Sequence, residues 1–513
     1  MDRTEPRSGW RTQAWVAVPW LALVFGIAYA QYPLYYLTQN QYFFHGLAHA
    51  GYGLLRGDWL ARTADPWPLF SLLVEWTYRL VDPRAFYVYF LLLLGVYAYS
   101  MLGILSVQFG VDRSRATLLV TLALLAALHS PLAAAVAEGL LGFNEGRELV
   151  VGVASQRILW DMLHPGAFGV FLLLSIYVFL RGRPFLAVVS AAFAASVHPA
   201  YVLSAGVLSL SYVVILAGRR QGFGQPLRLA ACALVSLLPV IVYMAVAFRP
   251  TSPGTWMEAQ AVLVRALERH AVPARWLDFT VYIKIALVAA ALYLVRRTEL
   301  FWVMLISFVV AIGLTLVQIA SGNDTLALIY PWRLSVYLVP LSTMIVAASL
   351  LSPLLRLVER CPPPSQNALA GISVVILVAL MGAGALVTAR RSNFLTEREV
   401  PISTYEFVRK TKAPGQTYLI PVEWRYFRLY TGAPVFVEKR FNPYEDTAVL
   451  EWQRRLRIAE AFYAHPESRC QTPGAMPAEV GITHAVVPKT EAAACDWTLE
   501  FDGGDYRVFR VAP

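Results

Sequence analysis

Long runs of apolar residues separated by short polar segments fill this chain up to about residue 390. Each run approaches the roughly 20 residues that an α-helix needs to cross a bilayer. The runs lie at 15–31, 84–109, 115–135, 164–180, 184–197, 200–217, 226–248, 279–295, 300–319, 331–352 and 367–389. The pattern therefore predicts a bundle of about eleven transmembrane helices.

Arginines gather in every second segment between these runs, which indicates how the bundle is oriented. They are Arg113 and Arg115, Arg181 and Arg183, Arg219, Arg220 and Arg228, Arg296 and Arg297, and Arg356 and Arg360. The positive-inside rule places these segments and the N-terminus in the cytoplasm, and an odd number of helices then places the tail outside. An alternative concerns the stretch 183–218, which only His198-Pro199 interrupts and which could be a hairpin that does not cross fully. Merging or dropping one helix there would place the tail inside.

The remaining segments are longer, rich in aromatic residues and predicted to lie outside: 32–83, 136–163, 249–278 and 320–330. We expect 249–278 to form an amphipathic helix along the membrane surface. The large first loop, 32–83, concentrates ionisable side chains within a few turns: His45, His49, Arg56, Asp58, Arg62 and Asp65. This asymmetry predicts that the working face of the protein is outside.

The tail has a different composition, because charged residues become frequent and β-rich runs alternate with helical patterns. We predict strands at Thr417–Pro421, Val435–Glu438, Thr483–Pro488, Trp497–Phe501 and Tyr506–Val511, and helices near 403–411 and 445–464. The fold class is therefore mainly α, with a transmembrane module over 1–389 and a small α/β domain over 390–513. A domain of about 120 residues is large enough to have its own core.

Composition supports a membrane protein. Of 513 residues, 58% are hydrophobic and 15% charged, against about 25% charged in soluble proteins. Mean hydropathy is +0.53. The net charge of +10 does not indicate nucleic-acid binding, because the arginines between helices already account for it. The first apolar run has no small-residue cleavage site, so we predict a retained helix rather than a signal peptide.

The cysteines bear on the compartment of the tail, and the missing motifs narrow the functional class of the protein. Cys470 and Cys495 both lie in the tail and could pair in an oxidising compartment, or remain two thiols. A Walker A loop, a GxGxxG motif and HEXXH are all absent from the sequence, which argues against ATP-driven transport and a bound dinucleotide. His45 and His49 have metal-ligand spacing, but no third ligand follows from the spacing. A divalent metal is therefore an open alternative, and no metal ligand is assigned.

Several stretches together resemble the GT-C superfamily of integral-membrane glycosyltransferases, in particular bacterial members without a characterised activity. They are NQYFFHGLAHAG and GDWLARTADPWPLFS in the first loop, SQR with HPG at 155–166, AASVHP at 194–199, PWRLSVYLVPLS at 331–342, and FVEKRFNPY with EW at 436–452. The resemblance implies transfer of a sugar from a polyprenyl-phosphate donor to a glycan, lipid or protein acceptor. It also implies the outer face of a bacterial inner membrane, with a carboxylate in the first loop as the general base.

By this resemblance Asp58 is the expected base and Asp65 the substitute, since many members carry an acidic pair in that loop. Arg333 and Arg157 are expected to hold the donor phosphate, because a guanidinium binds phosphate oxygens through two N–H groups. The acceptor or cleft would involve the residues His45, His49, His164 and Asp324.

Structural alternatives exist for the same residues. Asp58 could cap a helix that starts at Trp59, Asp65 before Pro66 is a strong turn signal, and Arg333 could anchor the membrane interface beside Trp332. Two further functions are open, namely a GT-C-like assembly subunit without catalysis, and a transporter or flippase of lipid-linked sugars.

Overall fold

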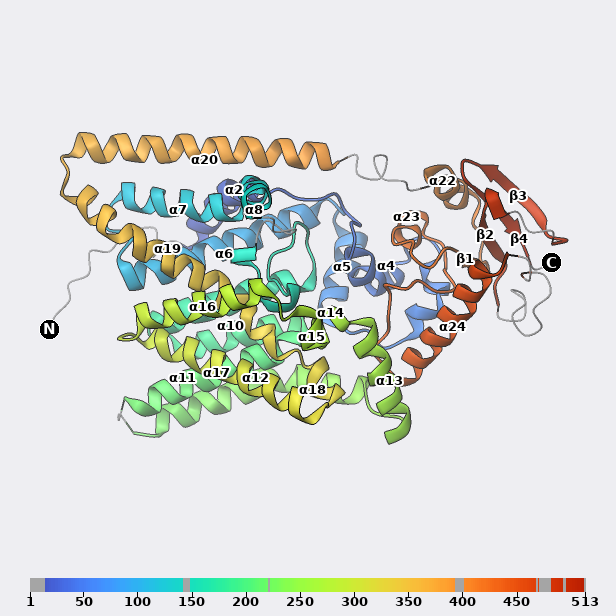
Figure 1. Cartoon of the computed structure of the whole chain (residues 1–513), viewed down its shortest axis with the longest axis horizontal. Helices are drawn as coiled ribbons and strands as arrows, with labels where there is room; N and C mark the ends of the chain where they lie inside the picture. The colour runs from blue at the N-terminus through green and yellow to red at the C-terminus, as the bar shows by residue number, and fades with distance from the viewer. Residues whose placement is uncertain are drawn as a thin grey trace. The chain divides into compact units, whose positions relative to one another are not determined.

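The computed structural model describes residues 14–141, 148–219, 222–392, 401–466, 469, 481–491 and 495–511 (Figure 1). The chain forms two compact units. The first comprises Met1–Tyr32, Phe86–Val242 and Leu267–Arg391, and the second comprises Pro33–Ala85, Tyr243–Ala266 and Ser392–Pro513. The predicted first outside loop thus belongs to the same unit as the tail, whereas the sequence suggested a single boundary at residue 389.

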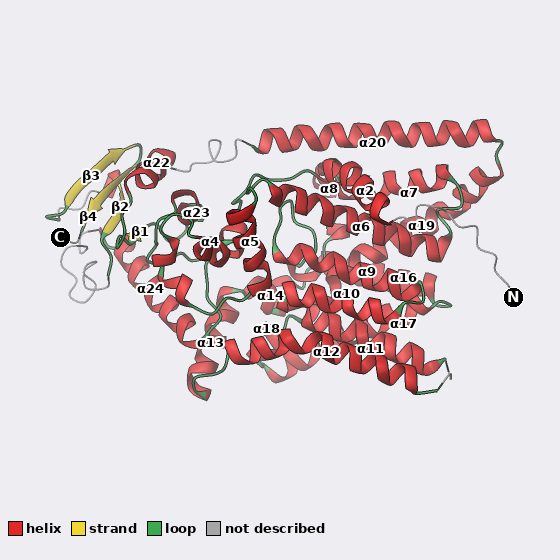
Figure 2. Cartoon of the chain, turned by 180° about the vertical axis from the view of Figure 1, so that it is seen from behind, coloured by secondary structure: helices red, strands yellow, loops and turns green. Residues whose placement is uncertain are grey.

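Figure 2 shows that the first unit is built of helices and connecting loops. Its helices are α2 (Ala14–Tyr29), α6 (Ala85–Phe109), α7 (Arg115–His129), α8 (Pro131–Leu141), α9 (Val170–Leu180), α10 (Pro184–Val197), α11 (Val202–Gly218), α12 (Gly224–Ala247), α14 (Glu268–Ala271), α15 (Pro273–Trp276), α16 (Phe279–Val295), α17 (Glu299–Ser321), α18 (Asp324–Leu328), α19 (Ser335–Arg360) and α20 (Pro363–Arg391). Every predicted apolar run contains one of these helices. His198-Pro199 does break the stretch 183–218, into α10 and α11.

Six helical stretches among the described residues are long and apolar enough to cross a membrane. They are Ala85–Phe109, Pro199–Gly218, Gly224–Ala247, Glu299–Ser321, Asp324–Arg360 and Pro363–Arg391. Five more apolar helices are shorter, at 10–17 residues. A multi-pass helical membrane protein is therefore confirmed, while the count of eleven crossings stays a prediction. Large apolar side chains such as Val235 and Val378 are exposed, as lipid-facing residues would be.

Small residues let the helices of the first unit approach closely. A Cβ on Gly95 of α6 would lie 2.5 Å from the backbone oxygen of Val18 in α2. A Cβ on Gly384 of α20 would collide with the backbone oxygen of Ile27 in the same α2. Glycine at such contacts is typical of membrane helices, where packing replaces the hydrophobic effect as the source of association.

The second unit combines helices from three chain segments with one sheet. Its helices are α3 (Gln39–Tyr42), α4 (Phe44–Ala50), α5 (Pro68–Leu80), α13 (Pro253–Ala266), α22 (Ile402–Thr411), α23 (Phe427–Thr431) and α24 (Asp446–Ala464). The predicted amphipathic segment does form a helix, α13. Its buried residues include Val262 and Leu263, and the helix packs against α24. The predicted helices near 403–411 and 445–464 are confirmed as α22 and α24.

The sheet has the strand order β1-β2-β4-β3. Strand β1 (Tyr418–Leu419) is parallel to β2 (His484–Pro488), and β4 (Tyr506–Arg510) is antiparallel to both β2 and β3 (Thr498–Gly503). The strand predicted at Val435–Glu438 is wrong, since only an isolated bridge joins Val435 to Tyr418. Its first N–H group is used elsewhere, because Val435 N donates to the carboxylate of Asp58.

The cysteines that the structure describes differ in their bonding state. Cys495 is disulfide-bonded. Cys232 and Cys361 are free. Cys470, the predicted partner, lies outside the described residues. Disulfides persist in oxidising compartments and are rare in the cytosol.

The contact of Gly384 with α2 leads to a matched pair of substitutions on one helix. We expect Gly384→Ala to lower the melting temperature in detergent, because the new methyl group has to push α20 away from backbone atoms, at a cost of about 1–3 kcal/mol. Gly382→Ala is the control, since its Cβ would meet nothing within 4 Å. Equal melting temperatures for the two variants would show that α20 does not pack on α2 at Gly384.

Candidate functional site

Arg333 is placed by an irregular entry into α19. Tyr330 has a left-handed backbone (φ 53°), and Pro331–Leu334 forms a 3₁₀ turn. The Arg333 guanidinium lies 5.5 Å from the ring centroid of Tyr330 and 5.9 Å from that of Tyr201. Its Nε is buried and has no hydrogen-bond acceptor within the described part of the chain. The cation is therefore held over two aromatic rings, a favourable but neutral environment.

Arg157 follows a tight turn that is anchored to α19. Ala154 and Ser155 both have positive φ, at 57° and 56°. Val153 N donates to the hydroxyl of Ser335 at 2.8 Å, and a Cβ on Gly152 would lie 2.5 Å from that same oxygen. Only glycine allows so close an approach. The guanidinium carbon of Arg157 lies 4.2 Å from the ring centroid of Trp160.

A buried ion pair holds this turn from the other side. Lys284 of α16 pairs with Glu148, and its ammonium group also donates to the backbone oxygen of Gly152 at 3.2 Å. The Lys284 side chain is 4% exposed. Sequence reasoning missed this pair, although a lysine inside an apolar run is in itself a signal for a functional or structural partner.

Two histidines link the turn that carries Arg157 to Arg333. His270 Nδ1 donates to the backbone oxygen of Ala154 at 2.7 Å. Burial is the main cause that lowers the pKa of His270, and the nearby Arg333 and Arg157 lower it further. Burial and the same two arginines also lower the pKa of His164, whose Nδ1 accepts a hydrogen bond from Gly166 N at 3.1 Å. Both histidines are thus neutral neighbours of two cations.

We call Arg157, Arg333, His164 and His270 the cationic cluster. Arg157 and Arg333 both lower the pKa of His164 and of His270, so the four side chains lie near one another. Two cations close together attract an anion, and arginine suits phosphate because it presents two parallel N–H donors. Non-glycine residues in the left-handed region cost of order 1–3 kcal/mol and gather at functional sites. Three of them, Ala154, Ser155 and Tyr330, lie beside these arginines in sequence.

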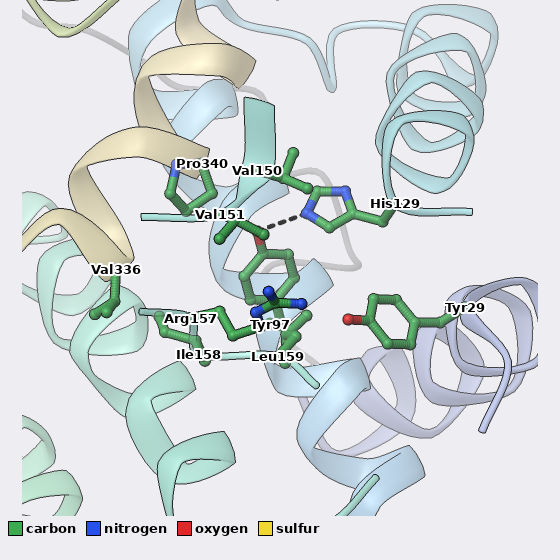
Figure 3. A pocket seen from close by; sticks show the side chains of 10 residues that line it. All are labelled: Tyr29, Tyr97, His129, Val150, Val151, Arg157, Ile158, Leu159, Val336 and Pro340. Atoms are coloured by element: carbon green, nitrogen blue, oxygen red, sulfur yellow. Dashed lines mark hydrogen bonds between the residues drawn. The ribbon is translucent and has the colours of Figure 1, made fainter. Parts of the chain in front are cut away.

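A small pocket, with room for about one water molecule, lies against Arg157 (Figure 3). It is lined by Tyr29, Tyr97, His129, Val150, Val151, Arg157, Ile158, Leu159, Val336 and Pro340. Arg157 therefore belongs to both the cluster and the pocket. The sequence did not point to Tyr29, Tyr97 or His129, because each lies at or within an apolar run where aromatic residues are common.

In the second unit Asp58 is fully enclosed by structural contacts. One carboxylate oxygen caps a 3₁₀ turn by accepting from Leu60 N at 3.0 Å. The other accepts from Arg428 Nε and from Val435 N, both at 2.9 Å. Its side chain is 0% exposed. These contacts favour the capping alternative for Asp58 over the role of general base, because the carboxylate is fully buried and three hydrogen bonds already hold it in place.

Arg428 is the centre of that buried network. It also faces Glu438 at 3.6 Å, and its guanidinium lies within about 5 Å of the rings of Phe44 and Phe441, at 5.1 and 4.8 Å. Burial raises the pKa of the Glu438 carboxyl to about 7, although the charge of Arg428 opposes the shift. Neither residue was singled out from the sequence, because a fully buried ion pair between distant segments leaves no local pattern.

Asp65 is differently placed. It is half-buried, and its Oδ1 accepts from Trp67 N at 2.9 Å, which is the predicted turn. The Tyr243 hydroxyl donates to its backbone oxygen at 2.6 Å. His45 lies close by: burial lowers the pKa of His45, and Asp65 is the largest influence in the opposite direction. The ring of Trp67 makes edge contacts with Tyr42 and Tyr444, at 4.4 and 5.9 Å between centroids.

The other predicted residues are more dispersed. His49 is exposed and lies 4.0 Å from Glu75. Asp324 begins α18, where the positive end of the helix dipole favours a carboxylate. Among the described residues no group of three His, Cys, Asp or Glu side chains is arranged to hold a metal ion. The carboxylates near the cationic cluster are already engaged, because Glu148 pairs with Lys284, and Asp161 with Arg391 at 2.8 Å.

Comparison with known proteins gives a family match and a structural likeness. Residues 402–459 match a family model described as a domain of unknown function, DUF6798, and this region contains Arg428 and Glu438. No curated protein matches the chain. The chain is similar to the crystal structure of ArnT from Cupriavidus metallidurans bound to undecaprenyl phosphate, with 13% identity, a TM-score of 0.40, and coverage of 99% of this chain and 98% of that chain.

The raised pKa of Glu438 leads to a prediction on pH and stability. The folded carboxyl holds its proton up to about pH 7, and the unfolded one only to about 4.5. The fold is therefore favoured by this group below pH 4.5, and that advantage is lost as pH rises through 7, with an order of magnitude of 3 kcal/mol. We expect Glu438→Gln, which stays neutral, to reduce the fall in melting temperature between pH 5 and pH 8.

Glu423→Gln is the control for this experiment, because Glu423 is exposed and pairs with Lys439 at the surface. Its melting temperature should depend on pH as that of the unmodified protein does. An identical pH dependence for Glu438→Gln and the unmodified protein would contradict a protonated carboxyl beside Arg428.

Proposed function

We propose that this protein is a membrane glycosyltransferase that moves a sugar from a polyprenyl-phosphate donor to an acceptor on the outer face of a bacterial inner membrane. The observation that carries the proposal is the convergence of Arg157 and Arg333 in a unit made of membrane helices. The resemblance of the sequence motifs to the GT-C superfamily supports the same class. The disulfide at Cys495 supports an outside position for the tail.

The two arginines would act on the leaving group. During transfer, the acceptor oxygen bonds to the anomeric carbon while the bond from that carbon to the phosphate oxygen breaks. Negative charge then grows on the phosphate, and fixed guanidinium groups stabilise it most where water is scarce. His270 and His164 are neutral, so the two arginines are the cations of the cluster.

The general base is proposed at Asp65. The acceptor hydroxyl has to lose its proton as its oxygen attacks, and a carboxylate within reach accepts it. Asp65 is half-buried and uses one oxygen for its turn, whereas both oxygens of Asp58 are engaged with Arg428, Val435 and Leu60. His45 would orient the carboxylate or the acceptor. His49 and Asp324 stay predictions for acceptor contacts.

The first test concerns the donor phosphate. We expect Arg333→Ala to weaken binding of undecaprenyl phosphate to the detergent-solubilised protein about 10- to 100-fold, which corresponds to one charge-assisted contact. Arg333→Lys should recover part of this affinity, because a lysine keeps the charge but not the paired N–H groups. Arg297→Ala is the control, since Arg297 is exposed between α16 and α17. Unchanged affinity in Arg333→Ala would sink the phosphate assignment.

The second test concerns the base. Release of polyprenyl phosphate from radiolabelled lipid-linked sugars in host membranes should fall about 10²- to 10⁴-fold in Asp65→Asn, the range for loss of a general base. Binding of undecaprenyl phosphate should stay unchanged. Asp82→Asn is the control, because Asp82 forms a similar turn with Arg84 N in an exposed position. Full turnover by Asp65→Asn would remove Asp65 as the base. Absence of turnover in the unmodified protein, despite lipid binding, would favour a non-catalytic subunit or a flippase.

A further inference from the structure

Helix α5 of the second unit carries large apolar side chains on two opposite sides. Its inner side packs against α4 (Figure 1). The approach is close, because a Cβ on Gly46 of α4 would lie 2.7 Å from the Cβ of the fully buried Val74. The outer side has four apolar residues that are between 36% and 76% exposed, and we call them the apolar stripe: Leu69, Leu72, Trp76 and Leu80.

The apolar stripe is continuous along the helix and has little polar cover. Its residues follow one another at intervals of three, four and four positions, which places them on one face. A helix at a water-exposed surface ordinarily carries polar residues on that face. The two ionic residues of α5 are occupied beside it, because Glu75 and Arg79 pair at 2.8 Å and Arg79 also donates to the backbone oxygen of His49. An exposed apolar face of this kind marks a contact surface.

The course of the chain indicates what this surface contacts. Helix α5 ends at Leu80, and α6 begins at Ala85 and is long and apolar enough to cross a membrane. The five steps from Leu80 to Ala85 span at most roughly 18 Å, at about 3.6 Å for each residue. Val81, the first residue of this connection, is also exposed. The end of the apolar stripe therefore lies close to the first turn of a membrane-crossing helix.

We propose that the apolar stripe of α5 inserts into the surface of the lipid bilayer and anchors the first loop there. Helices of this type bury their apolar side about 5–10 Å into the boundary between headgroups and acyl chains. Trp76 suits that boundary, because an indole has an apolar body and a polar N–H group. The turn of Asp65 leads directly into α5, so the same contact fixes the depth of Asp65 at the membrane surface. The inference goes beyond the proposed function, since a subunit without catalysis would use the same anchor.

The test locates the apolar stripe by quenching of a fluorescent label. The label is attached to Leu72→Cys or Trp76→Cys in a full chain that carries Cys232→Ser and Cys361→Ser, because those two thiols are free. The protein is placed in phosphatidylcholine nanodiscs in which some lipids carry a nitroxide just below the headgroup. We expect these lipids to quench both labels about threefold or more strongly than a label in water, because the stripe reaches the depth of the nitroxide.

Leu499→Cys is the matched control. Leu499 is an exposed leucine of the same unit, in β3, and its neighbours Thr498 and Glu500 are exposed polar residues. We expect iodide in the water to quench its label strongly and to quench the two labels of the apolar stripe weakly. Each labelled variant has to elute as the unmodified protein does, and Leu80→Cys supplies a further position on the stripe if one of them does not.

Two results would overturn the inference. If iodide quenches the labels at Leu72 and Trp76 as strongly as the label at Leu499, the apolar stripe lies in water. If neither iodide nor the nitroxide lipids quench them, protein covers the stripe, as a second copy of the chain would. Both results leave the proposed function standing, because that function depends on phosphate binding by Arg333. Its failure in turn leaves the lipid contact of α5 unaffected.

Discussion

Two guanidinium groups repel each other, and the first unit is built so that Arg157 and Arg333 cannot move apart. Arg157 follows a turn whose backbone bonds to Ser335, and Ser335 in turn donates to the backbone oxygen of Trp332 at 2.6 Å. The hydrogen bonds from Val153 to Ser335 and from Ser335 to Trp332 thus connect the two chain segments that carry the arginines. Aromatic rings flank both of them, Trp160 at Arg157, and Tyr201 and Tyr330 at Arg333. A fold that holds two cations close together favours anion binding, because a bound phosphate offsets the repulsion between the two guanidinium groups.

The helical architecture could be predicted from the sequence because it depends on local patterns. Apolar runs give helices wherever a bilayer or a core excludes water, and each predicted run contains a helix. The sequence also singled out Arg157, Arg333 and His164, and both arginines lie near enough to His164 to lower its pKa. The absence of a strand at Val435–Glu438 could not be predicted, because the first N–H group of that segment bonds to Asp58, a residue 377 positions away.

The roles of the two aspartates show where such prediction ends. Asp58 and Asp65 lie seven residues apart in one loop, and each precedes a local turn that its carboxylate caps. Sequence spacing treats them alike. What separates them is Arg428, which engages the second oxygen of Asp58 and has no counterpart at Asp65 among the residues that the structure describes. The chemistry available to a carboxylate is therefore set by a partner hundreds of residues away, which no motif in the loop records.

The ion pair between Arg428 and Asp58 explains why the second unit includes the first loop as well as the tail, although the sequence predicts a single boundary at residue 389. An arginine that is 1% exposed is tolerated only when its charge is compensated, and removing one partner of a buried pair typically costs 3–5 kcal/mol. Glu438 compensates little, since its raised pKa favours the neutral form. Asp58 thus supplies the compensating charge. The core around α23 consequently depends on the first loop, and a tail cut at residue 390 would lack the charge that Arg428 requires.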